Sequence, residues 1–93
     1  MIPPTIGRKV WYRPSQEDLG ASGMTQHNPD QAFDATVVYV WNDNCVNLSI
    51  LDHAGEDWRR TCVAINNTEG ASAWAEWMPY QIGQAKKHEE ETK

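Results

Sequence analysis

The chain has 93 residues, which limits it to one small domain. Its formal net charge of −5 argues against binding to extended DNA or RNA, because that binding depends on Lys and Arg side chains that neutralise phosphates. No run approaches the ~20 apolar residues of a membrane-spanning helix, and the first ten residues lack the apolar run of a signal peptide, so we expect a cytosolic protein.

The first predicted strand is "RKVWYR", residues 8–13. In an extended strand Lys9, Trp11 and Arg13 project to one face, whereas Tyr12 projects to the other. We expect Tyr12 in the core and Trp11 at the surface between two cations. That face is either a set of surface cation–π contacts or a platform for a planar or anionic ligand.

A long loop is predicted after this strand, because residues 14–33 are rich in Gly, Pro, Ser, Asn and Asp. A loop of this length in a small domain is usually functional or disordered.

Three β-branched-rich runs follow and are separated by the turn clusters "NDN" and "HAGE", which predicts a three-strand meander. The first turn places Trp41 opposite Val46 and Tyr39 opposite Leu48, and the second places Val63 opposite Val46. One shared core face is therefore expected, made of Val37, Tyr39, Trp41, Val46, Leu48, Ile50 and Val63.

The predicted pairing of the second and third strands of the meander also positions the two cysteines. It places Cys45 opposite Ala64 and Cys62 opposite Asn47, so the thiols are diagonal neighbours roughly 7–8 Å apart. A disulfide does not span that distance comfortably, and we expect reduced thiols.

The C-terminal part contains a second loop, residues 66–74, followed by "AWAEWMPYQIG". Because Pro79 limits a helix, this segment predicts a short helical turn that enters a last short strand. We expect residues 1–83 to form a single β domain and residues 84–93 a charged, flexible tail. The predicted fold is mainly β, a small five-stranded SH3-like barrel with a long loop after the first strand and a short helical turn near the C-terminus.

The sequence lacks the usual signatures of catalysis and metal binding. None of its His and Cys residues has the spacing of a zinc site, no cysteine has an obvious base, and "GASG" lacks the context of a phosphate loop. We therefore expect no enzyme, no metal and no cofactor, but a binding protein. "DWRRT" repeats the combination of Trp with cations, and the predicted ligand-binding residues are Lys9, Trp11, Arg13, Trp58, Arg59 and Arg60.

Three stretches, "PTIGRKVWYRP", "DATVVYVW" and "EWMPYQIGQAKK", together resemble a family of small, mostly uncharacterised proteins of tailed bacteriophages and prophages. The resemblance covers most of the chain except residues 15–33 and 66–73, and it assigns no role to any residue. It implies a non-enzymatic accessory protein in the bacterial host cytoplasm that acts by binding.

Three hypotheses follow for this binding protein. The first is a counter-defence factor that sequesters a nucleotide-type signal through Trp and Arg side chains, at a subunit interface of a homo-oligomer. The second is a protein–protein inhibitor of a host defence protein, anti-CRISPR-like, with its acidic surface against a basic partner. The third is an SH3-type peptide-binding module that uses Pro79 and Tyr80. None of the three involves extended nucleic acid or a membrane.

Overall fold

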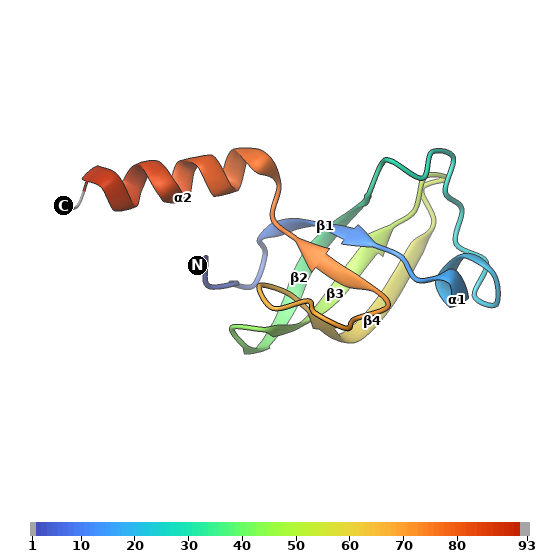
Figure 1. Cartoon of the computed structure of the whole chain (residues 1–93). Coiled ribbons are helices and arrows are strands. Elements are labelled where there is room, and N and C mark those ends of the chain that lie inside the picture. Colours follow the sequence, from blue (N-terminus) through green and yellow to red (C-terminus); the bar gives the residue numbers. More distant parts are fainter. Residues whose placement is uncertain (1, 92–93) are drawn as a thin grey trace.

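Five short strands, each with one apolar face, close into a barrel in the computed structural model, which describes residues 2–91, with side chains described through Lys86 (Figure 1). The elements are β1 (Lys9–Arg13), α1 (Gln16–Leu19), β2 (Phe33–Asn42), β3 (Cys45–Leu51), β4 (Asp57–Ala64), β5 (Trp74–Glu76) and α2 (Pro79–Glu91).

The strands follow the order β1-β2-β3-β4-β5 around the barrel, and β5 pairs back onto β1 in antiparallel orientation. The contact between β4 and β5 is parallel and consists of one pair among the described residues, Ala64 with Trp74. The predicted mainly β, five-stranded barrel and its long loop after the first strand are confirmed, and the arrangement is consistent with an SH3-like barrel. The short helix α1 lies within the long loop.

The core fills the barrel with the inward side chains of all five strands. Tyr12 is 1% exposed, as predicted, and its ring packs near that of Phe33, with centroids 6.4 Å apart. The buried apolar residues are Val10, Tyr12, Met24, Phe33, Ala35, Val37, Val46, Leu48, Ile50, Val63, Ile65, Ala75 and Trp77.

The predicted core positions of Tyr39 and Trp41 are wrong, since these side chains are 46% and 56% exposed. The register of β2 against β3 shifts between Val37 and Tyr39 and again between Val40 and Asn42. Each shift adds a residue to β2, and an added residue reverses the alternation of faces. Tyr39 therefore lies opposite Asn47 instead of Leu48, and Val46 lies opposite Val40 instead of Trp41.

The register of β3 against β4 was predicted correctly at the end of the hairpin away from its turn, where Val46 pairs with Val63 and Cys45 with Ala64. A further shift follows, and Cys62 takes a positive φ of 54° there. Both cysteines are free.

A helix near the C-terminus is confirmed, but the predicted order of helical turn and strand is wrong, because β5 precedes α2. Pro79 is the first residue of α2, where the missing N–H of proline costs nothing. The helix points away from the barrel on the side opposite α1 (Figure 1). It continues through residues 84–91 of the predicted tail, and residues 92–93 lie outside the described residues. Within the described part of the chain, neither helix has the length and apolar character needed to cross a membrane.

Candidate functional site

The outer face of β1 brings together three of the six predicted ligand-binding residues, Lys9, Trp11 and Arg13. Trp11 lies opposite Asp34 of β2 on one side and opposite Glu76 of β5 on the other. The guanidinium of Arg13 lies 5.8 Å from the centroid of the Trp11 ring, which is a cation–π contact.

Each cation on this face is paired with one of these carboxylates. Lys9 Nζ lies 3.1 Å from Asp34 Oδ2, and Arg13 Nε lies 3.1 Å from Glu76 Oε1. Glu76 Oε1 also accepts a hydrogen bond of 3.0 Å from the indole of Trp74. Both cations of this face are therefore paired with carboxylates of neighbouring strands.

Trp11 borders a pocket of about 670 Å³, which we name the Trp11 pocket. This volume is within the range of about 300–1,000 Å³ that small-molecule and cofactor sites occupy. Its polar lining is mainly acidic, since Asp30 and Asp34 both contribute. The lining residues are Trp11, Arg13, Asp30, Gln31, Ala32, Asp34, Leu51, Asp52, His53 and Gly55.

His53 holds the loop that forms one wall of this pocket. Its Nδ1 accepts a hydrogen bond of 2.9 Å from the backbone N–H of His27, and its Nε2 lies 3.2 Å from the carbonyl of Ala32. An accepting Nδ1 requires the proton of the neutral ring to be on Nε2, which then donates to Ala32. The rings of Phe33 and His53 pack edge to face, with centroids 4.9 Å apart, so His53 has a structural role.

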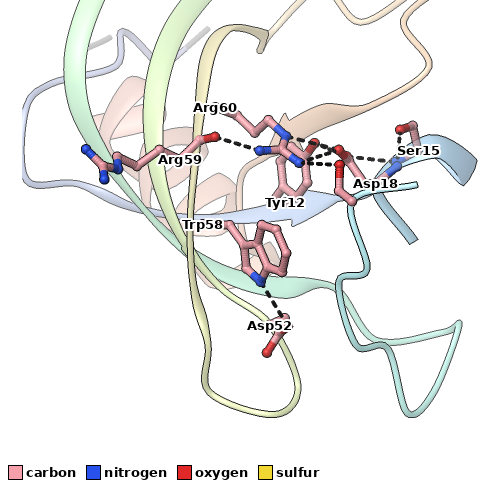
Figure 2. A network of polar contacts seen from close by, with 8 residues as sticks. Tyr12, Ser15, Asp18, Asp52, Trp58, Arg59 and Arg60 are labelled. Carbon is pink, nitrogen blue, oxygen red and sulfur yellow. Dashed lines mark hydrogen bonds and ion pairs between the residues drawn. The ribbon is translucent and has the colours of Figure 1, made fainter. Parts of the chain in front are cut away.

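Asp52 organises the β3–β4 turn below the pocket. Its buried carboxylate accepts hydrogen bonds of 2.9–3.0 Å from the backbone N–H groups of Thr25, Ala54 and Glu56. It also accepts one of 2.9 Å from the indole of Trp58 (Figure 2). Burial alone would raise the pKa of this carboxyl, but the four hydrogen bonds lower it to about 2. The charge of Asp52 is thus satisfied within the protein.

The second predicted group, Trp58, Arg59 and Arg60, is divided between the two faces of β4. Trp58 pairs with buried Ile50 and packs against the core, whereas Arg59 is exposed on the outer face. Arg60 pairs with buried Leu48 and reaches α1 (Figure 2). The structure therefore does not bring these three side chains together in one site.

Arg60 is fully engaged in contacts within the protein. Its Nε and Nη2 lie 3.0 Å from Asp18 Oδ1, and its Nη1 donates to the carbonyl of Arg59 over 2.7 Å. Its Nη2 also lies 3.2 Å from the hydroxyl of Ser22. These contacts give Arg60 a structural role in joining β4 to α1.

Asp18 is the centre of this buried network (Figure 2). It accepts hydrogen bonds from the Tyr12 hydroxyl and from the backbone N–H of Ser15, while the Ser15 hydroxyl accepts from the Asp18 N–H as a capping box. Burial alone would raise the pKa of the Asp18 carboxyl, but the bonds from Tyr12, Ser15 and Arg60 lower it. Burial and Asp18 raise the pKa of the Tyr12 hydroxyl.

Sequence reasoning missed several residues of these sites. The spacing of Ser15 and Asp18 is a recognised capping signal that could have predicted the start of α1. No comparable signal marks Tyr39 and Trp41, whose exposed rings pack edge to face at 4.9 Å and 75°. The Trp41 indole donates to Asn47 Oδ1 over 2.9 Å, which fixes the ring in its exposed position.

The described residues contain no group of three His, Cys, Asp or Glu side chains that could hold a metal ion. Burial and the neighbouring Cys62 thiol raise the pKa of the Cys45 thiol, which disfavours the reactive thiolate. Comparisons of the chain with protein-family models, with curated proteins and with solved structures found no match.

Proposed function

We propose that the protein is a non-enzymatic binding module that holds a short segment of a partner protein in the Trp11 pocket and acts as a protein–protein inhibitor. The observation that carries this proposal is the pocket itself, whose lining brings together Trp11, Asp30 and Asp34. A Trp in a concave site with convergent polar groups is a common anchor for a partner.

Two features support binding rather than catalysis at this pocket. His53 and Asp52, two groups that could act in acid–base chemistry, are both committed to hydrogen bonds that build the walls. Cys45 and Cys62 lie elsewhere, on β3 and β4. The pocket is thus a preformed surface without an activated nucleophile among its lining residues.

Sequestration of a nucleotide-type signal is the second candidate, and the stacking surface of Trp11 and the size of the pocket favour it. The ion pairs weigh against it. Lys9, Arg13 and Arg60 each lie 3.0–3.1 Å from a carboxylate oxygen, so a phosphate would compete with an existing partner. The net charge of −5 adds a further penalty for an anion.

The resemblance to accessory proteins of tailed bacteriophages suggests where the partner is found. We propose a protein of the bacterial host cytoplasm as the target, with a basic surface that complements the acidic chain. This assignment depends on the resemblance and on net charge, whereas the choice of pocket depends on its geometry.

The test is affinity capture from a bacterial lysate with the parent protein, with Trp11→Ala and with Trp41→Ala as a matched control that removes another exposed ring. A host protein captured by the parent and Trp41→Ala but lost with Trp11→Ala supports the proposal. Equal capture by all three proteins contradicts it. A nucleotide that copurifies with the parent protein and is lost with Trp11→Ala, detected by native mass spectrometry, would favour the second candidate instead.

A further inference from the structure

The Trp11 ring has an acidic residue opposite it on each neighbouring strand. Asp34 of β2 and Glu76 of β5 are its cross-strand partners, and residues in such positions have Cβ atoms about 4.5–5.5 Å apart. A third acidic residue, Asp30 of the long loop, lines the same pocket. An aromatic face among carboxylates is a favourable environment for a cation.

The charges around the ring do not cancel. Three carboxylates, those of Asp30, Asp34 and Glu76, face two cations, Lys9 and Arg13, and the Asp52 carboxylate lies in the same lining. The excess is negative, as in the whole chain. A positively charged group therefore gains electrostatic energy on entering the pocket, whereas an anion loses it.

Arg13, which is itself part of the pocket lining, is already paired with a carboxylate. Its guanidinium is held at the Glu76 end by the 3.1 Å contact with that carboxylate, and its Nη1 donates to the carbonyl of Asp30 over 3.4 Å. It already uses the Trp11 ring at 5.8 Å, which shows that the ring is oriented to accept a cation.

Apolar surface that could contact the methylene stem of a long side chain lies in the row of outer-face residues that runs across β1, β2 and β3 from Trp11. Trp11 of β1 is opposite Asp34 of β2, and Asp34 is opposite Leu51 of β3. Leu51 is 38% exposed and lines the pocket. Lys and Arg side chains commonly pack their methylene groups on apolar surface while the charged end remains at polar groups.

We propose that the Trp11 pocket selects a lysine or arginine side chain of the partner segment, with its methylene stem over Trp11 and Leu51 and its charge toward Asp30 and toward Asp34, for which it competes with Lys9. This inference rests on the proposed function and names the chemistry of its ligand.

The test is an NMR titration of the full chain with two acetylated and amidated tripeptides, Gly-Arg-Gly and its neutral isostere with citrulline in place of arginine. The arginine peptide is expected to shift the Trp11 indole N–H in a saturable manner, with affinity at least about tenfold above that of the citrulline peptide. Asp30→Asn is expected to weaken arginine binding about three- to tenfold, whereas Asp43→Asn, which removes an exposed carboxylate in the β2–β3 turn, leaves it unchanged.

Each contrary outcome has a distinct meaning. Equal affinity for the two peptides at Trp11 overturns the selection of a cation but leaves the pocket as a peptide site. Absence of any Trp11 shift up to about 10 mM peptide overturns the inference, while the capture experiment with Trp11→Ala still decides the proposed function. Saturable binding of adenosine monophosphate at Trp11 without binding of the arginine peptide overturns both.

Discussion

Replacing Asp18 with Ala is expected to lower the free energy of unfolding by about 3–5 kcal/mol, the range observed when one partner of a buried ion pair is removed. The Tyr12 hydroxyl, in a residue 1% exposed, would lose its acceptor, which costs about 1–3 kcal/mol. The lost contact with Arg60 adds an amount at the low end of the range for a hydrogen bond to a charged group, because the Arg60 side chain is 28% exposed and can be solvated by water instead. Loss of the capping box at Ser15 contributes about 1 kcal/mol.

The assay is urea unfolding followed by tryptophan fluorescence, together with thermal melting. A loss of this size lowers the melting temperature by at least about 12 °C, since 1 kcal/mol corresponds to about 4–8 °C in a domain of this size. Tyr12→Phe should cost only about 1 kcal/mol, because Asp18 keeps its bonds to Ser15 and Arg60. Asp43→Ala, at an exposed position, should stay within about 0.5 kcal/mol of the parent. If the free energy of unfolding of Asp18→Ala lies within about 1 kcal/mol of the parent value, the Asp18 network does not hold α1 on the barrel.

Three further outcomes are expected. Tyr12→Ala should lower the free energy of unfolding by about 3–5 kcal/mol through a core cavity, whereas Trp11→Ala, on the outer face, should leave the protein folded. Thermal melts compare the two variants, and a greater loss of stability in Trp11→Ala than in Tyr12→Ala would contradict the assigned faces. The pKa of Asp52 is lowered from 3.8 to about 2 in the folded protein, so its charge stabilises the fold above its unfolded pKa and this contribution is lost as pH falls toward 2. Between these pH values the free energy of unfolding, measured in urea, should therefore fall more steeply with decreasing pH for the parent than for Asp52→Asn. Equal slopes for the two proteins would refute this role of the Asp52 charge. Truncation after Gly83 should shift the melting temperature by less than about 4 °C, because Gln84 and Lys86 are exposed on the projecting helix; a larger shift or loss of cooperative unfolding would show that α2 docks.

The buried face of β3 was predictable because this strand alternates without interruption. Val46, Leu48 and Ile50 occupy every second position, and all three are buried. On β2 the same rule fails after Val37, because the two register shifts depend on how the strand twists around the closed barrel and not on its composition. The exposed position of Tyr39 follows from that shift.

The candidate site was predictable only where it depends on local alternation. Lys9, Trp11 and Arg13 share a face because β1 is regular. The inward position of Arg60 depends on the register of β4 and on the placement of α1, which come from tertiary packing. Asp30 enters the pocket from an irregular loop, whose path no periodic pattern describes.

The single pair between β4 and β5 has a consequence for self-association. Residues 57–63 of β4, which precede Ala64, have no strand partner on the β5 side, and an unpaired strand edge is a template for addition of another chain. The guanidinium of Arg60 occupies the carbonyl of Arg59, and its contact with Asp18 joins β4 to α1. We therefore expect the polar network to limit aggregation as well as unfolding. Asp18→Ala is expected to scatter more light than Asp43→Ala at equal concentration and at temperatures well below its melting point.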